Sequence, residues 1–185
     1  MTSFSDTSII PGKRERVLEA VSAHVRILGA LVLRDMRTRF GGSYMGYMLA
    51  VLWPLSHVTV LALAFLGLSK VAPIGGSPGL FIATGVLPYI LVLYPARMMA
   101  LAVLHNFSAL QFPIVKTTDL IVARGIVEFF SAFLVVLLFS LILLALRVDL
   151  VPQDWTEVAT AIIAAVYLGV GFGTFNVIIM TLVRL

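Results

Sequence analysis

Four long apolar runs follow one another along the chain from about residue 43, separated by short polar, glycine-rich or proline-rich stretches. An apolar run of about 20 residues is long enough to cross the hydrocarbon core of a bilayer as an α-helix. The pattern therefore predicts an all-α membrane protein, a polytopic helical bundle in which residues 43–185 form the transmembrane domain. Its predicted spans lie at about residues 47–69, 80–104, 120–146 and 158–182.

The segment ahead of these runs has a helical rather than a continuous apolar pattern. After a polar stretch at residues 1–12, which predicts a mobile tail without a cleavable signal, residues 13–42 predict an amphipathic helix ended by a Gly-Gly pair. Its two faces are apolar (Val17, Val21, Leu28, Val32) and basic (Arg16, Arg26, Arg34, Arg37). Such a helix can lie in the headgroup layer of a membrane, or it can serve only as an anchor that sets orientation.

Three further breaks in the pattern shape the predicted bundle. Pro88 and Pro95 fall inside the second span and predict a helix that is not straight. Residues 105–119 are too polar for lipid and predict a loop with a short helix that ends at Phe112-Pro113. In the fourth span, glycines recur at every second position, which favours close helix packing; they are Gly169, Gly171 and Gly173.

Charge sets the predicted orientation. The chain is 61% hydrophobic and 12% charged, far below the roughly 25% charged residues of a soluble domain. Its net charge of +4 comes largely from basic residues before the first span, with Lys116 in the 105–119 loop, whereas the opposite side carries Lys70 and Arg147. By the positive-inside rule both termini face the cytoplasm, and a nucleic-acid partner is not expected.

The residues offer little chemistry for an enzyme. The chain has no cysteine, and His24, His57 and His105 fall in separate segments without metal-ligand spacing. No phosphate-binding glycine loop with its lysine occurs. We therefore expect no catalytic site, no metal site and no cofactor bound by this chain, so that any ATP and Mg would be bound by a separate ATPase.

Two groups of intramembrane residues permit two interpretations each. Arg97 and Glu128 lie at a similar predicted depth, roughly 10 to 12 Å from the cytoplasmic end, and are predicted to face each other or to share a polar pocket, as an interhelical clamp or as part of a substrate path. Five aromatic residues suit either an interfacial belt or an inward surface on which sugars stack. They are Tyr44, Tyr47, Trp53, Tyr89 and Tyr94.

Two segments carry a family resemblance. Leu31 to Leu55, LVLRDMRTRFGGSYMGYMLAVLWPL, resembles the entry segment of ABC-2-type exporter permeases, and its RTRFGGSYMGY part is most similar to the capsular-polysaccharide exporters. Phe112 to Phe129, FPIVKTTDLIVARGIVEF, is similar to a second motif of that family, and Arg97 falls where those permeases have an arginine. The matching positions of the second motif are Pro113, Lys116, Asp119, Arg124 and Glu128.

The resemblance implies a permease subunit of an ATP-driven exporter that moves capsular polysaccharide across the bacterial inner membrane. Export of O-antigen or teichoic acid, or a non-transporting membrane assembly or scaffold role, are the alternatives. The implied partners are a second permease copy, a dimeric ABC ATPase, a lipid-linked anionic polysaccharide, and periplasmic and outer-membrane export proteins. The family has six spans, so this chain is expected to correspond to its first four.

The resemblance also assigns roles to particular residues. The 105–119 loop would couple to the ATPase through Phe112, Pro113, Lys116 and Asp119. The substrate-entry candidates near the membrane surface are Arg34, Arg37, Arg39, Tyr44 and Tyr47. Arginine side chains offer fork-like donors for phosphate or carboxylate groups, although solvated anchor charge is an equally simple role for them.

Overall fold

The computed structural model describes residues 13–39, 41, 44–68 and 78–184, and over these residues every regular element is helical. The predicted all-α class is therefore confirmed, whereas the predicted tail at residues 1–12 lies outside the described residues. The elements are α1 (Lys13–Arg39), α2 (Tyr44–Leu68), α3 (Pro78–Met99), α4 (Ala102–His105), the 3-10 helix η1 (Phe107–Gln111), α5 (Thr117–Ala145) and α6 (Trp155–Arg184).

Four of these helices, α2, α3, α5 and α6, are long and apolar enough to cross a membrane. The chain is thus a multi-pass membrane protein. One predicted boundary is wrong: the second span does not run to residue 104, because α3 ends at Met99 and a turn precedes the short helix α4. At this turn the N–H of Leu101 donates to the carbonyl of Met98, the tighter spacing that commonly closes a helix.

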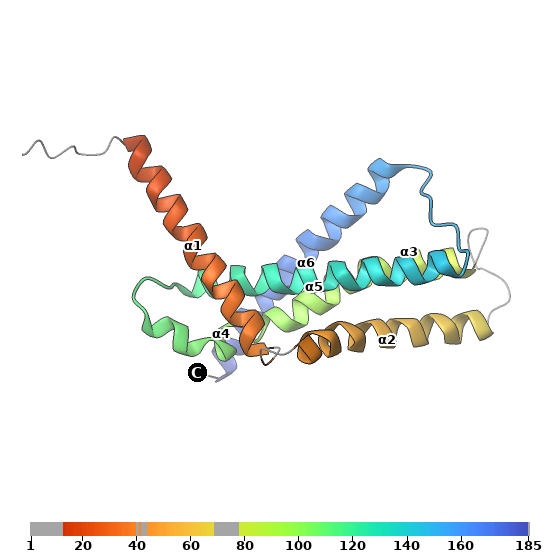
Figure 1. Cartoon of the computed structure of the whole chain (residues 1–185), viewed down its shortest axis with the longest axis horizontal. Coiled ribbons are helices and arrows are strands. Elements are labelled where there is room, and N and C mark those ends of the chain that lie inside the picture. Colours follow the sequence, from red (N-terminus) through yellow and green to blue (C-terminus); the bar gives the residue numbers. More distant parts are fainter. Residues whose placement is uncertain (1–12, 40, 42–43, 69–77, 185) are drawn as a thin grey trace, which may run out of the picture.

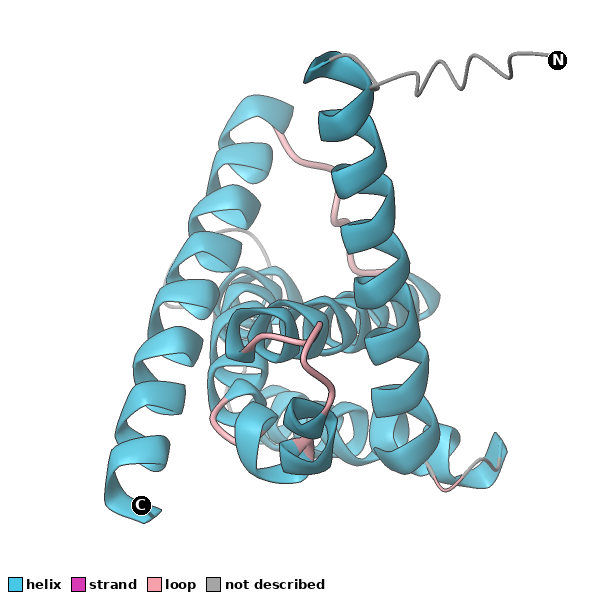
Figure 2. Cartoon of the chain, turned by 90° about the vertical axis from the view of Figure 1, so that its left-hand side faces the viewer, coloured by secondary structure: helices cyan, strands magenta, loops and turns pink. Residues whose placement is uncertain are grey.

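The helices α2, α3 and α5 lie side by side along the long axis of the molecule (Figure 1). Their shared core is apolar and includes Val58, Ile90, Val135, Phe139 and Leu143, each at most 2% exposed. Figure 2 shows α1 and α6 flanking this bundle on opposite sides. The outer face of α2, α5 and α6 stays rich in exposed apolar side chains, as expected of helices surrounded by lipid.

The helix α6 docks on α3 through small residues. A side chain at Gly169 would come within 3.0 Å of the carbonyl oxygen of Leu91, and one at Gly173 within 2.6 Å of the sulfur of Met99. Asn176, further along α6, donates a hydrogen bond of 3.0 Å to the carbonyl of Ala96. Two of the three predicted close-approach glycines therefore make that approach. Gly171 does not, because it is exposed with nothing within 4 Å.

The loop between α5 and α6 is held by a cap at each end. After α5, the N–H of Arg147 donates to the carbonyl of Leu144 and the N–H of Val148 to that of Leu143, the Schellman arrangement. Before α6, the carboxylate of Asp154 accepts the N–H of Thr156 at 2.6 Å, and this bond holds the pKa of Asp154 below its ordinary value. The second cap is therefore present at neutral pH and weakens as the pH falls through that lowered pKa.

Arg147 has a φ angle of 60°, the left-handed conformation that costs a residue other than glycine about 1 kcal/mol or slightly more. Arg147→Gly is therefore expected to raise the free energy of unfolding by about 1 kcal/mol, measured as a higher thermal midpoint in mild detergent. Ala145→Gly, two residues earlier at the last position of α5, is the matched control and should lower stability by up to about 1 kcal/mol. Equal effects of the two glycines would contradict the role of the left-handed cap.

Candidate functional site

The face of α1 that meets the bundle is polar at both ends and apolar in the middle. Ile27 and Leu31 pack against the start of α5 and η1, at Leu120, Ala123 and Ala109. His24 and Asp35 lie one turn to either side on the same stripe. Of the four apolar residues predicted to share one face, Val32 packs partly against this contact, whereas Val17 and Val21 are both 55% exposed and Leu28 is only half-buried.

A buried ion pair joins α1 to α5. Nη1 of Arg124 lies 3.0 Å from Oδ1 and 3.1 Å from Oδ2 of Asp35, and neither residue is more than 3% exposed. Oδ1 of the same carboxylate also accepts a hydrogen bond of 3.0 Å from the side-chain amide of Asn106. Charges removed from water need partners of this quality, so the pair fixes where α1 lies against α5.

Arg124 also faces a second carboxylate. Its Nε lies 2.9 Å from Oε1 of Glu128, one turn further along α5, and Glu128 is 2% exposed. This is an ion-pair distance, although the N–H is not aimed closely enough at the oxygen to form a hydrogen bond. Arg97, by contrast, is exposed in the last turn of α3. The structure thus gives Glu128 an ionic partner on its own helix, and a contact between Arg97 and Glu128 stays a prediction.

The segment that leaves α3 is bound to the same network. The amide of Asn106 donates a second hydrogen bond of 3.2 Å to the carbonyl of Ala102, and Nη2 of Arg34 donates one of 2.6 Å to the hydroxyl of Ser108. The bonds from Arg34 to Ser108 and from Asn106 to Asp35 link α1 to this segment, while the bond to Ala102 lies within it. We refer below to Asp35, Asn106, Arg124 and Glu128 as the buried network; it ties three separate parts of the chain together.

The residues predicted to couple to an ATPase divide into two groups. Phe112, Pro113 and Lys116 are exposed, with Phe112 at 60%. Asp119 is 3% exposed instead: its Oδ2 accepts the N–H of Lys116 at 2.9 Å, and its Oδ1 lies 3.6 Å from Nε2 of His24. Asp119 therefore caps the start of α5, where a carboxylate also suits the helix dipole, and does not present its side chain to the surface.

The exposed residues border a small groove between α1 and the loop. Its volume is about 270 Å³, and its walls are apolar apart from Arg34 at one edge. Phe112 and Ile114, both more than half exposed, form part of the loop side of this groove. The groove and the exposed tip of the loop together make one surface at this end of the molecule.

The substrate-entry candidates are not gathered at one point. Arg34 is half-buried and bonded to Ser108, and Arg37 is exposed further along α1. Tyr44 is 98% exposed at the start of α2, whereas Tyr47 is half-buried against the core. The side chain of Arg39 lies outside the described residues. Among the candidates whose side chains the structure describes, Arg34 is the one that lines the groove beside the loop.

Sequence reasoning missed Asp35 and Asn106. A signal for Asp35 was available, since it lies one helical turn beyond Leu31 on the inward stripe, where an acidic residue needs a buried partner. No such signal existed for Asn106, because its partner lies 71 positions away. Arg124 and Glu128 were recognisable in the motif, but the ion pair that Arg124 forms with Asp35 of α1 was not.

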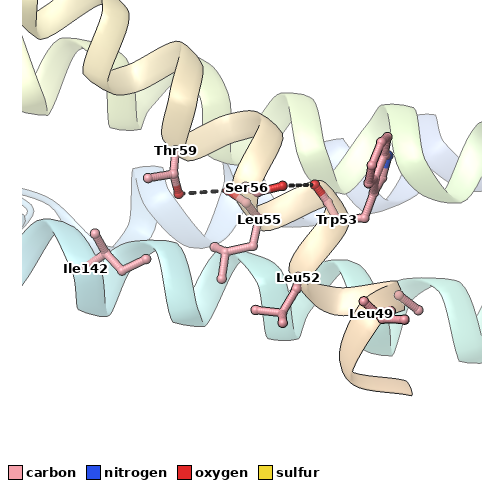
Figure 3. Close-up of a pocket in the computed structure, with 8 residues that line it drawn as sticks. Leu49, Leu52, Trp53, Leu55, Ser56, Thr59 and Ile142 are labelled. Atoms are coloured by element: carbon pink, nitrogen blue, oxygen red, sulfur yellow. Dashed lines mark hydrogen bonds between the residues drawn. The ribbon is translucent and has the colours of Figure 1, made fainter. Parts of the chain in front are cut away.

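A second, larger groove of about 790 Å³ lies between α2 and α5 (Figure 3). It is lined by Leu49, Leu52, Leu55 and similar side chains, with Trp53 at its edge. The hydroxyls of Ser56 and Thr59 both donate to carbonyls of their own helix. Its polar groups are thus already satisfied, so this groove suits an acyl chain or an apolar helix better than a sugar.

Among the described residues no group of three or more His, Asp or Glu side chains could hold a metal ion. The chain was compared with known proteins. No protein-family model matches, and no solved structure matches.

Two curated proteins are similar to this chain. Both are polysialic acid transport proteins KpsM from Escherichia coli, 33% and 32% identical over 101 residues. That region covers 54% of this chain and 38% of each relative, so the match spans less than half of the relatives' length. The matches agree with the resemblance that the two motifs carry, in a chain with four membrane-capable helices.

Proposed function

We propose that this chain is a membrane permease subunit of an ATP-driven exporter that moves capsular polysaccharide across the bacterial inner membrane. The observation that carries the proposal is the similarity to the KpsM transport proteins in a chain with four membrane-capable helices. Nothing in the proposal requires a catalytic site in this chain. ATP hydrolysis belongs to a separate ATPase dimer, which works with a second copy of this permease.

The arrangement of the helices supports one orientation. The start of α2, the segment from α4 to α5 and the end of α6 lie at the same end of the bundle, and the loop from α5 to α6 lies at the other (Figure 1). The basic residues of α1 and Lys116 belong to the first of these ends. By the positive-inside rule we assign that end to the cytoplasm. A lipid-linked anionic polysaccharide would then meet Arg34 and Arg37 on its way in.

The exposed loop surface supports a docking role for Phe112, Pro113 and Lys116. These side chains are free to contact a partner, and the segment behind them is bonded to α1 through Arg34 and Asn106. A partner that moves the loop would therefore move α1 as well. Asp119 contributes by holding the start of α5 in place.

Docking can be tested by co-expressing the full-length permease with the ATPase encoded beside it and purifying the complex. Phe112→Ala with Lys116→Glu is expected to reduce co-purification of the ATPase at least about tenfold, since exposed aromatic anchors often contribute 2 kcal/mol or more. Membrane insertion should be unchanged. Val151→Ala with Asp149→Lys, on exposed residues of the opposite loop, is the control and should leave co-purification intact.

Two results would refute the proposed function. The first is that the unmodified chain binds no ATPase, as expected of a membrane scaffold. The second is that the chain binds an ATPase but no anionic glycan changes the ATPase activity of the complex. Stimulation by teichoic acid or O-antigen and not by capsular polymer would keep the exporter and change its substrate.

A further inference from the structure

One face of α3 is polar although it is not packed against the rest of the described chain. Gly85, Tyr89 and Arg97 lie at i, i+4 and i+12, so they share one stripe of the helix, on which the partly buried Leu93 takes the position between Tyr89 and Arg97. All three are exposed; Tyr89 is 50% exposed, and a side chain added at Gly85 would meet nothing within 4 Å. Tyr94 lies beside the stripe, half-buried and packed partly against the core.

The other faces of α3 are covered. Ile82, Ile90 and Leu91 pack into the core shared with α2 and α5, while Ala96 and Met99 face α6. The polar stripe is therefore the face that these helices leave open. It differs in kind from the apolar groove between α2 and α5, whose hydroxyls are bonded to their own helix.

Such a stripe is costly against lipid. Tyr89 lies ten residues from the end of α3, about 15 Å at the helical rise, which places its hydroxyl near the middle of a bilayer of about 30 Å. Arg97 alone could reach the headgroups by extending its side chain along the helix. Tyr89 is too far from them, and an exposed phenol at that depth lacks the hydrogen-bond partners it needs. The stripe thus calls for a polar neighbour at the depth of Tyr89.

The positive charge of Arg97 indicates which kind of polar neighbour would suit the stripe. Arg124 is enclosed by two carboxylates, but Arg97 has no ion-pair partner within the described part of the chain. A fixed cation followed by tyrosine rings suits a polymer that carries carboxylates or phosphates and has sugar faces to stack.

We propose that Arg97, Tyr94, Tyr89 and Gly85 form a water-accessible binding strip for an anionic glycan, which enters at Arg97 and moves along α3. The proposal rests on the proposed export function and assigns a substrate-contacting surface to it. Arg97 attracts the negative groups, the tyrosines contact the sugar rings, and Gly85 leaves room where a side chain would narrow the path.

The absence of cysteine from the whole sequence makes a direct test possible. Tyr89→Cys is introduced into the full-length chain in membranes and treated with a sulfonate-bearing or a trimethylammonium-bearing methanethiosulfonate, reagents that need an ionised thiol in water. Phe130→Cys is the control, because Phe130 is 58% exposed on the apolar outer face of α5 and lies at a comparable depth. Rates are normalised to those of the denatured variants.

We expect Tyr89→Cys to react at least about tenfold faster than Phe130→Cys, since water reaches one and lipid surrounds the other. The anionic reagent should react faster than the cationic one, and adding Arg97→Gln should lower that preference about fivefold or more, the size of effect that a fixed charge has on local ion concentration. An oligogalacturonate should slow the reaction, whereas a neutral maltooligosaccharide of equal length should not.

Several results would overturn the proposal. Equal reaction rates for Tyr89→Cys and Phe130→Cys would show that the strip faces lipid or a second copy of the chain. Disulfide formation between two copies of Tyr89→Cys would identify the second copy as the neighbour. A preference for the anionic reagent that survives Arg97→Gln would remove its anion-binding role, and equal protection by the neutral glycan would remove the charge selection. Labelling needs neither the ATPase nor export. The labelling test and the co-purification test can therefore fail separately, and each failure identifies which proposal is wrong.

Discussion

Arg124→Met is expected to lower the free energy of unfolding by about 3–5 kcal/mol, the usual cost of removing one partner from a buried ion pair. The change leaves the carboxylates of Asp35 and Glu128 buried without their cation, and neither is more than 3% exposed. The measurement is thermal unfolding of the full-length chain in mild detergent, followed by circular dichroism and by the fraction that remains monodisperse.

Two further variants separate charge from packing. Adding Asp35→Asn and Glu128→Gln to Arg124→Met should restore more than half of the lost stability, because amides need no counterion. Arg26→Met, on the exposed part of α1, should cost no more than about 0.5 kcal/mol. A triple variant as unstable as Arg124→Met alone would show that the side-chain volume of the arginine matters and its charge does not.

Gly169→Leu is expected to destabilise the contact between α6 and α3 by about 1–3 kcal/mol, the typical cost of overpacking. Even the first carbon of the new side chain would lie 3.0 Å from the carbonyl oxygen of Leu91 and 3.0 Å from the ring of Phe129. A backbone oxygen cannot move aside cheaply, so α6 has to shift. The same unfolding assay, together with faster proteolysis of the loop between α5 and α6, reports the change.

The neighbouring Gly171→Leu is the matched control, since it lies on the same helix with open space around it. It should be neutral or slightly stabilising, because leucine favours a helix more than glycine does by somewhat under 1 kcal/mol. If both leucines destabilise the protein alike, the close approach to α3 is not the cause.

The apolar pattern predicted the helices well and their ends less well. Each span is a run whose length is fixed by bilayer thickness, and this signal is local in the sequence. The end of α3 at Met99 was missed because residues 100–104 are as apolar as the span itself. The segment after the break is held by the hydrogen bond of Asn106 to the distant Asp35, which no local pattern encodes.

The candidate site shows a similar division. Pro113, Lys116 and Asp119 were recognisable by motif, but only the structure separates the exposed loop tip from the buried cap formed by Asp119. Likewise, matching depth predicts that Arg97 and Glu128 face each other, which stays a prediction, and only the structure shows that Arg124, four residues away on the same helix, is an ion-pair partner of Glu128. Depth along two helices says nothing about the direction in which each side chain points.

The sequence by itself therefore determined the membrane class, the four spans, the charge that orients them and the resemblance to a family of polysaccharide exporters. These properties follow from composition and from residues close together in the chain. Only the tertiary structure decided that Asp35 and Arg124, 89 positions apart, form one buried pair, and that the polar stripe of α3 is left uncovered. Both depend on how the helices are rotated and crossed, which is fixed by the packing of the whole bundle rather than by any single segment.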